Sequence, residues 1–382
     1  MHPALLLQPD SRFIHDVMVS GGQDLKKCMQ CGTCSVICAL APEDEAFPRK
    51  QMLEAQWGLK NRLVGDPAIW LCHNCGDCTT YCPRGARPGD VFGALRQQAI
   101  EHFAFPGFLG KMAGNPKALA LLLLPPALLF WAIARSSQTT RNPQELEFAS
   151  VFPIPVLEAL FFALSGFVLV VFGIGLARFI RALQASGSGS IGPSALGAAL
   201  VEIMTHKRFS DCAGSKNRRT GHLLTLWGFA GLAVTGTVVG IGSMAGLMRT
   251  PLALTSPWKI LANLSAAAIL VGCVILLVDR IRDPVRRAAT TYFDWFFLLT
   301  LTGVVLTGIA AQLLRLAQAD QMMYGVYFVH LVLIFSLFLY APYSKFAHIA
   351  YRTVAMAAAR RGAGRSSLEG RRQAAADGVI RQ

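Results

Sequence analysis

The chain has 382 residues, of which 53% are hydrophobic and 15% are charged, and its formal net charge is +14. This composition is more apolar than that of an average soluble domain. The basic residues flank apolar segments and form no stripe with interleaved aromatics, so the charge does not indicate nucleic-acid binding. The composition changes along the chain from mixed to strongly apolar and then to small, polar and basic. We therefore expect a soluble domain over residues 1–116, a membrane domain over residues 117–352 and a basic tail over residues 353–382.

Helical spacing of apolar residues predicts that the N-terminal domain is built from helices alone. The first helix runs from Arg12 to Val19 and stops at Gly21-Gly22. Further helices are expected after Phe47-Pro48, at Ile69 to Leu71, and from Gly89 to Phe103. The predicted fold class is therefore all-α, with a helical two-cluster domain followed by a helical transmembrane bundle.

Eight of the ten cysteines form two copies of the spacing C-x2-C-x2-C-x3-C. The copies are Cys28, Cys31, Cys34 and Cys38, then Cys72, Cys75, Cys78 and Cys82. This run binds [4Fe–4S] clusters in bacterial ferredoxins, because a loop with cysteines two residues apart curls around a cube. Gly32 and Gly76 occupy the same place in each run, where a backbone without Cβ approaches the inorganic sulfides. The sequence therefore predicts two [4Fe–4S] clusters.

In two-cluster ferredoxins the fourth cysteine of each run binds the other cluster. We therefore assign Cys28, Cys31, Cys34 and Cys82 to the first cluster, and Cys72, Cys75, Cys78 and Cys38 to the second. The alternatives are disulfides, which need an oxidising compartment, and zinc, which paired C-x2-C motifs also bind. Nothing at the N-terminus resembles a cleaved signal peptide, and two complete four-cysteine runs favour clusters. His73, beside Cys72, is expected to be an ordinary surface residue.

Six apolar segments approach the length of about 20 residues that a bilayer demands. They are Ala118–Ala134, Pro155–Leu176, His222–Met244, Trp258–Val278, Trp295–Leu314 and Val326–Tyr340. Basic residues gather between the second and third segments and between the fourth and fifth. The positive-inside rule places these loops, both chain ends and the cluster domain in the cytoplasm. We expect a multi-pass protein of the bacterial inner membrane.

Histidines in the apolar region suggest a second redox cofactor. His330 and His348 are predicted to lie 18 residues apart on the last helix, and because 18 residues are five whole turns, both share one face about 27 Å apart. His222 begins the third segment at the depth expected for His348, so the two are predicted to bind one haem b. His330 is a candidate ligand of a second haem, although the positions expected to hold its partner include Gly231. His206 is an alternative ligand of the cytoplasmic haem.

Three ionisable residues, Glu158, Lys259 and Asp294, lie within the apolar segments near their ends, and the cost of a charge there favours a proton relay. With His330 they are our candidates for the quinone and proton chemistry that the family resemblance described below implies. The alternative for the first three is that their charged ends extend to the membrane surface.

Residues 24–98, with Cys28-Met29-Gln30-Cys31-Gly32 and Phe47-Pro48-Arg49, resemble the C subunit of heterodisulfide reductase. Residues 155–352, which hold five of the six spans, resemble the membrane cytochrome shared by the heterodisulfide reductase E subunit and the nitrate reductase gamma subunit. A fusion of the two is similar to the C subunits of quinone-interacting membrane-bound oxidoreductase complexes (QmoC). In the nitrate reductase gamma pattern four histidines bind two haems, and His222, His330 and His348 fit three of those places.

The resemblance implies an electron-transport subunit of a quinone-linked oxidoreductase, with little catalysis of its own. It would pass electrons between menaquinone or ubiquinone in the membrane lipid and flavin and iron–sulfur subunits like QmoA and QmoB, and onward to adenylylsulfate reductase in sulfur metabolism. No nucleic-acid partner is expected. Two alternatives remain open: a membrane-anchored polyferredoxin without haem or quinone site, and a redox sensor with a regulatory tail.

Overall fold

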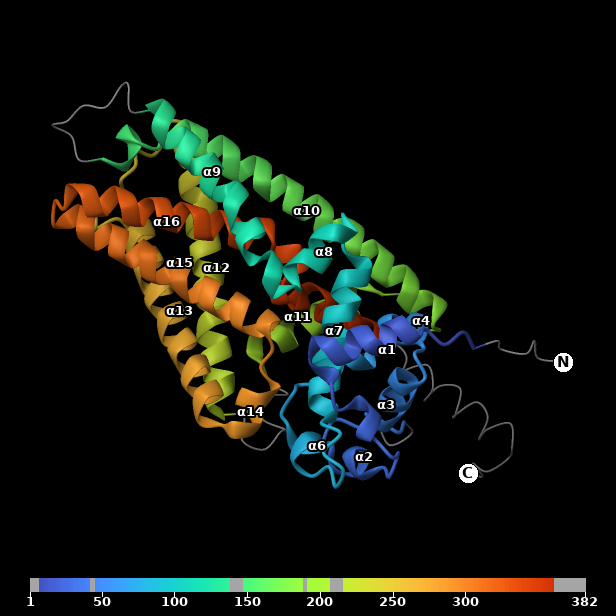
Figure 1. Ribbon diagram of the computed structural model, residues 1–382. Coiled ribbons are helices and arrows are strands. Elements are labelled where there is room, and N and C mark those ends of the chain that lie inside the picture. The colour runs from blue at the N-terminus through green and yellow to red at the C-terminus, as the bar shows by residue number, and fades with distance from the viewer. Residues whose placement is uncertain (1–6, 42–44, 138–146, 188–190, 207–215, 361–382) are drawn as a thin grey trace, which may run out of the picture. The chain divides into compact units, whose positions relative to one another are not determined.

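A computed structural model describes residues 7–41, 45–137, 147–187, 191–206 and 216–360. Every regular element in these ranges is a helix, which confirms the predicted fold class (Figure 1). The chain divides into two compact units. The first comprises the described residues within Met1–Gly107, Gly173–Ser215 and Ala347–Gln382, and the second those within Phe108–Phe172 and Lys216–Phe346.

The first unit contains the expected helical cluster domain. Its helices are α1 (Ser11–Val17), α2 (Thr33–Ile37), α3 (Arg49–Gln56), α4 (Lys60–Val64), α5 (Ala68–Leu71), α6 (Asp77–Thr80), α7 (Pro88–Phe103), α11 (Pro193–Thr205), the end of α10 (Ile154–Ala185) and a helix over 348–360. Helix α1 begins one residue before the predicted Arg12, because the Asp10 carboxylate caps it by accepting a hydrogen bond from the Phe13 N–H at 3.0 Å. Helix α7 is the centre of this domain, because α1, α4, α5 and α6 all pack against it.

Gly58, two residues after the end of α3, has a left-handed backbone with φ +68°. The Asp10 N–H donates to its carbonyl oxygen at 3.0 Å, and a Cβ on Gly58 would lie 2.5 Å from the carbonyl oxygen of Asp10. Only glycine accepts both the conformation and the close approach. The N-terminal segment is thereby held against the end of α3.

An aromatic cluster of Trp70, Phe103, Phe179 and Tyr351 forms part of the core of the first unit. Trp70 is 1% exposed and stacks on Tyr351, with ring centroids 5.2 Å apart. The rings of Phe103 and Phe179 complete the cluster. Gly175 leaves room for the Tyr351 hydroxyl, which would lie 2.7 Å from a Cβ at that position. The α5 turn that precedes Cys72 is thus packed against the helix over 348–360.

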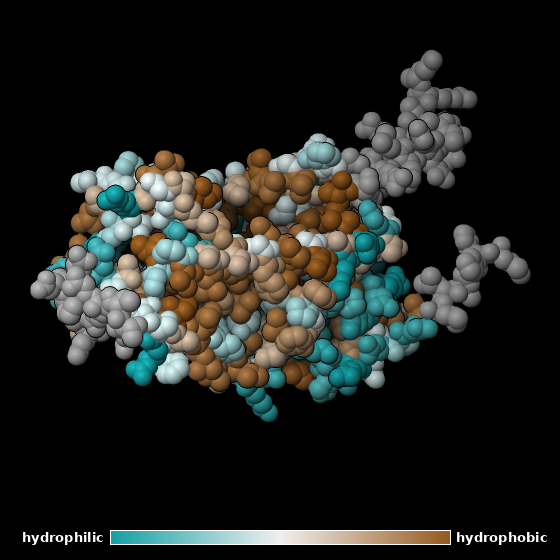
Figure 2. Space-filling model, turned by 90° about the horizontal axis from the view of Figure 1, so that it is seen from above, coloured by the Kyte–Doolittle hydropathy of each residue, from teal (hydrophilic) through white to brown (hydrophobic). Residues whose placement is uncertain are grey.

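The second unit is built from long apolar helices. They are α9 (Leu119–Ser137), the first part of α10, α12 (Lys216–Met244), α13 (Pro257–Arg282), α15 (Tyr292–Leu316) and α16 (Asp320–Leu339), and two short helices, α8 (Gly107–Ala113) and α14 (Pro284–Ala289), accompany them. Six helices of the described chain are long and apolar enough to span a membrane, as predicted. In each of them, at most 33% of an apolar stretch of 18 residues is buried within the protein. Figure 2 shows hydrophobic residues over much of one face of the molecule. The chain is accordingly a multi-pass membrane protein.

Helices α12 and α13 pack closely and antiparallel through small residues. A Cβ added at Gly228 would lie 2.6 Å from the Ser265 carbonyl oxygen, and one added at Gly231 would lie 2.2 Å from the Ser265 hydroxyl oxygen. A Cβ added at Gly272 would lie 2.7 Å from the Gly221 carbonyl oxygen. Small residues are the usual means by which helix backbones approach in a membrane. Gly231, one of the positions at which the sequence predicts a partner for His330, is therefore part of a helix contact.

The prediction for His330 and His348 assumed that one continuous helix contains both, but the last apolar helix ends before His348. Helix α16 ends at Leu339, two 3-10 turns follow at Ala341–Tyr343 and Lys345–Ala347, and His348 begins a new helix. Pro342 explains the break, because proline has no N–H to donate and disfavours a helical residue before it. The prediction that the two histidines share one helix face is wrong.

Candidate iron–sulfur site

The two cysteine loops have the same local backbone conformation. Gln30 and Asn74, directly before the second cysteine of each run, have φ 59° and 52°, and Gly32 and Gly76, directly after it, have φ 86° and 95°. A short helix follows in each loop, α2 in the first and α6 in the second, and the two helices pack against each other (Figure 1). Left-handed residues on both sides of one cysteine make the chain curl, so the thiols of each run turn to its inner side.

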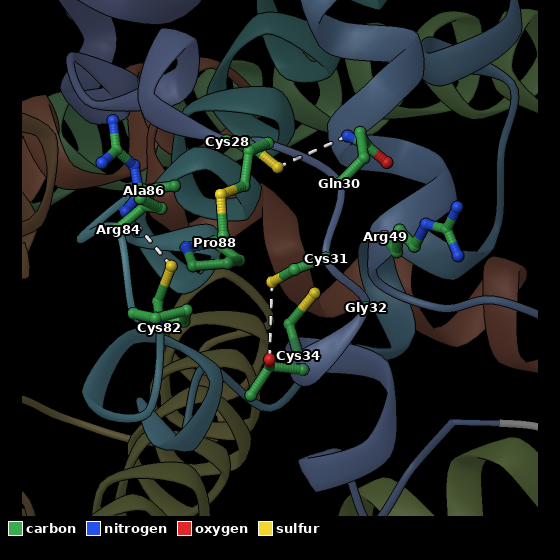
Figure 3. A pocket seen from close by; sticks show the side chains of 13 residues that line it. Cys28, Gln30, Cys31, Gly32, Cys34, Arg49, Cys82, Arg84, Ala86 and Pro88 are labelled. Carbon is green, nitrogen blue, oxygen red and sulfur yellow. Dashed lines mark hydrogen bonds between the residues drawn. The ribbon is translucent and has the colours of Figure 1, made fainter.

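The first loop and the last cysteine line one pocket. Cys28, Cys31 and Cys34 share it with Cys82, which comes from the second run (Figure 3). The pocket encloses about 350 Å³, part of it open to solvent, and Arg49 also lines it. The structure thus brings together the four cysteines that the crossed assignment groups as the first set.

The other four cysteines also gather in one place. Burial raises the pKa of the Cys38 thiol to about 11, and the neighbouring Cys72 and Cys75 contribute to the rise. Burial likewise raises the pKa of Cys78, with contributions from Cys72, Cys75 and Cys38. Cys38 therefore lies among the cysteines of the second run although it ends the first.

The two sets differ in exposure. Cys31 is exposed, and hydrogen bonds from the Thr33 side chain and backbone lower the pKa of its thiol. Cys34 is half-buried, and burial followed by the nearby Cys28 raises its thiol pKa. The first set therefore reaches the protein surface at Cys31, whereas all four cysteines of the second set are half-buried.

Both sets fit a cubane cluster. Each consists of three thiols from a curled loop and a fourth from the other run, and iron binding would deprotonate thiols that burial otherwise keeps protonated. A bound [4Fe–4S] cluster supplies reversible one-electron chemistry. Cys28, Cys31, Cys34 and Cys82 would hold one cluster, and Cys38, Cys72, Cys75 and Cys78 the other.

Hydrogen bonds to the sulfur atoms support the loops. The Gln30 side chain donates to the Cys28 Sγ at 3.4 Å, and the backbone N–H groups of Asn74 and Ala86 donate to the Sγ atoms of Cys72 and Cys82, each at 3.3 Å. Such bonds stabilise thiolates and tune cluster potentials. They come from residues that the cysteine spacing alone did not single out.

Gln56 is a further supporting residue that the sequence pattern did not reveal. Its side-chain amide donates to the carbonyl oxygens of Cys28 at 2.8 Å and Leu25 at 3.2 Å, and its Oε1 accepts from Gln30 at 3.3 Å. A glutamine in the last turn of α3 carries no motif. Only its packing beside the first loop reveals the role.

The prediction that His73 is a surface residue is wrong. Its side chain is 6% exposed, and its Nε2 lies 3.0 Å from the Arg352 guanidinium. The helix over 348–360 covers this part of the second loop within the first unit. Local sequence could not indicate a contact between residues so far apart in the chain.

The candidate haem ligands are spread over several elements. His222 lies on α12 in the second unit, and His348 begins the helix over 348–360 in the first. His206 follows the end of α11 in a left-handed conformation with φ 49°. His330, on α16, directs its Nδ1 to the Val304 carbonyl oxygen at 3.0 Å, with the Thr307 hydroxyl at 3.2 Å. With Nδ1 as the donor to that carbonyl, its Nε2 carries a lone pair, the arrangement of ligating histidines.

Asp294, one of the quinone candidates, has a structural role. Its carboxylate accepts from the Thr291 N–H at 3.1 Å, and the Thr291 side chain accepts from the Asp294 N–H, so the two residues form a capping box at the start of α15. The same carboxylate accepts from the Thr291 hydroxyl at 3.1 Å and pairs with Lys345. Glu158 lies in the first turns of α10 and Lys259 in the first turn of α13, and both are half-buried. All three stand near helix ends, as expected.

Comparison with known proteins divides the chain into two parts. Residues 24–86 match the 4Fe-4S dicluster domain family, and residues 108–376 match the Citrate utilization protein B family. Citrate utilization protein B of Escherichia coli is 28% identical over 87% of this chain and 89% of its own length. No solved structure matches the chain.

Several relatives that match only the N-terminal part are heterodisulfide reductase proteins. The C subunit of the H(2):CoB-CoM heterodisulfide,ferredoxin reductase of Methanothermobacter thermautotrophicus is 34% identical over 24% of this chain and 50% of its own length. A protein of Archaeoglobus profundus that is like the heterodisulfide reductase C subunit is 39% identical over 22% of this chain and 45% of its own length. The chain thus spans about half the length of these relatives, and its N-terminal part is an iron–sulfur domain related to them.

Proposed function

We propose that this chain, which belongs to the Citrate utilization protein B family, is a membrane electron-transfer subunit linking the quinone pool to a soluble redox partner. The observation that carries the proposal is the presence, in one chain, of two convergent sets of four cysteines and six helices long enough to span a membrane. Clusters bound to such sets exchange single electrons, and the membrane helices give access to a lipid-soluble quinone.

The test is electron transfer in the intact chain. The purified protein with its clusters, in detergent or vesicles, is mixed anaerobically with a short-chain menaquinol or ubiquinol, and cluster reduction is followed by EPR. The reverse reaction is started from dithionite-reduced protein and quinone. Exchange with either quinone supports the proposal. Clusters that form but exchange with no quinone in either direction leave the membrane-anchored polyferredoxin as the function.

A haem b is part of the proposed path. His222 and His348 are its proposed axial ligands, and His330 is the proposed ligand of a second haem. The support for His330 is the bond between its Nδ1 and the Val304 carbonyl, because ligating histidines hold their ring in this way. The sequence support for His222 and His348 is their resemblance to the nitrate reductase gamma pattern.

Reduced-minus-oxidised spectra of membranes test the haem. His222→Ala and His348→Ala should each remove the same b-type absorbance, whereas the matched variant His206→Ala should retain it. If His222→Ala retains full absorbance and His206→Ala loses it, the ligand pair includes His206. If every histidine variant, including His330→Ala, matches the unchanged chain, the haem assignment fails.

The proposed location is the bacterial inner membrane with the cluster domain in the cytoplasm. The basic residues of α14, Arg286 and Arg287, support this orientation, because cytoplasmic loops carry an excess of Lys and Arg. A single cysteine introduced at Arg287 in a chain whose other exposed thiols are blocked should react with a membrane-impermeant maleimide only in inverted vesicles. Labelling in intact cells would reverse the topology.

Two soluble partners are proposed for the same path. The resemblance to QmoC favours flavin and iron–sulfur subunits like QmoA and QmoB, with adenylylsulfate reductase beyond them. The similarity to Citrate utilization protein B over 87% of the chain favours an oxidoreductase that serves citrate utilization. Deletion of the gene distinguishes these two partners. If the partner is the QmoA- and QmoB-like pair, the host should lose adenylylsulfate reduction. If it is an oxidoreductase of citrate utilization, the host should lose growth on citrate alone.

A further inference from the structure

The carbonyl oxygen of Cys72, at the start of the second cysteine loop, accepts hydrogen bonds from two arginines. The Arg96 guanidinium donates to it at 3.0 Å, and the Arg352 guanidinium donates to it at 3.2 Å. Arg352 also donates to the Leu71 carbonyl oxygen at 3.4 Å. Two charged groups from helices far apart in the chain thus converge on one backbone oxygen.

The same guanidinium contacts the next residue of the loop. The Nη2 of Arg352 lies 3.0 Å from the Nε2 of His73, whose side chain is 6% exposed. Because an arginine has only donors, the Nε2 of this histidine is the acceptor. Arg352 is therefore bonded to three successive residues, Leu71, Cys72 and His73, at the point where the chain enters the second cluster loop.

Packing fixes Arg352 in this position. The preceding residue, Tyr351, stacks on Trp70 two residues before Cys72. One turn later, Met356 and Ala357 belong to a buried cluster against which Leu71 packs. The helix over 348–360 is thus held against the loop on both sides of Arg352, so the guanidinium has little freedom to move away.

These contacts place positive charge beside a proposed iron–sulfur cluster. Reduction adds one electron, and with it one negative charge, to a cluster core. A guanidinium nearby stabilises the reduced form, and the half-buried site weakens screening by water. Arginine remains charged throughout the physiological pH range, so its effect on the potential does not depend on protonation.

We propose that Arg352, with Arg96, is a positioning residue of the second cluster, which holds the Cys72 carbonyl and raises the reduction potential of that cluster relative to the first. The inference rests on the proposed function, because it assumes that both clusters are bound. It also means that the helix that begins at His348 contacts the second cluster loop through Arg352, four residues after that histidine.

The experiment is an EPR-monitored redox titration of the full-length protein with its clusters. Signals are assigned with Cys31→Ser for the first cluster and Cys75→Ser for the second. Arg352→Gln should lower the equilibrium constant for reduction of the second cluster about tenfold, which is about 59 mV for a one-electron couple. The first cluster should be unchanged. Arg352→Lys, which keeps the charge but not the forked geometry, should have a smaller effect.

Arg360→Gln is the matched control. Arg360 lies two turns later on the same helix and pairs with Glu202, so its loss should leave both midpoints unchanged. Arg96→Gln provides an independent test, and should lower the second midpoint even if Arg352→Gln fails to assemble. An unchanged second midpoint in Arg96→Gln and in the Arg352 variants that assemble overturns the proposal, as do equal shifts of both clusters. Absence of clusters from the unchanged chain would instead refute the proposed function.

Discussion

Replacement of Trp70 tests how the core of the first unit supports the second cysteine loop. Trp70 is 1% exposed and contacts the rings of Tyr351 and Phe179 at 5.2 and 6.0 Å. Truncation of a buried tryptophan to alanine costs about 3–5 kcal/mol, through lost burial and the cavity that remains. We expect Trp70→Ala to destabilise the protein by this amount.

Trp70→Phe should behave differently because the indole N–H is buried without a hydrogen-bond partner among the described residues. Phenylalanine buries roughly 50 Å² less apolar surface, a loss of about 1 kcal/mol at 25 cal/mol per Å². Removal of an unsatisfied buried donor recovers about 1–3 kcal/mol. The two effects nearly cancel, so we expect the stability of Trp70→Phe to lie within about 2 kcal/mol of the unchanged chain.

The assay is thermal unfolding of the detergent-solubilised protein under anaerobic conditions, followed by loss of the visible iron–sulfur absorbance at one fixed heating rate. Trp70→Ala should lower the midpoint by roughly 6–20 °C, from about 2–4 °C per kcal/mol. Trp57→Ala is the control, because Trp57 is 50% exposed, and should change little. If Trp70→Phe is as unstable as Trp70→Ala, the indole N–H makes a stabilising bond and the reasoning is refuted.

Three further predictions follow from the helix packing and the cysteine sets. Cys82→Ser should damage the cluster held by Cys28, Cys31 and Cys34, as measured by iron content and EPR; selective loss of the other cluster would refute the crossed assignment. Gly228→Ala should cost about 1–3 kcal/mol in chemical unfolding, because its Cβ would lie 2.6 Å from the Ser265 carbonyl oxygen. Asp294→Ala should cost about 0.5–2 kcal/mol by loss of the capping box. Quinone exchange at an unchanged rate in that variant would exclude Asp294 from the proton relay.

The sequence by itself determined the features that depend on local spacing. The length and polarity of apolar runs predicted all six long helices, since each must satisfy its own backbone and bury an apolar surface in lipid or protein. The cysteine spacing and the glycines predicted two curled loops, and Gly32 and Gly76 indeed have left-handed backbones. Such features are set by residues only a few positions apart, so no long-range contact is needed to infer them.

Only the tertiary structure decided which distant residues support those loops. The convergence of Arg96 and Arg352 on the Cys72 carbonyl joins residues 280 positions apart, and neither arginine belongs to a motif. The burial of His73 follows from the same contact. The break after Leu339 likewise depends on more than the apolar pattern, which continues through Tyr340 while the chain turns at Pro342. Periodicity reports which side of a helix is apolar, but the partner that covers that side is chosen by packing of the whole chain.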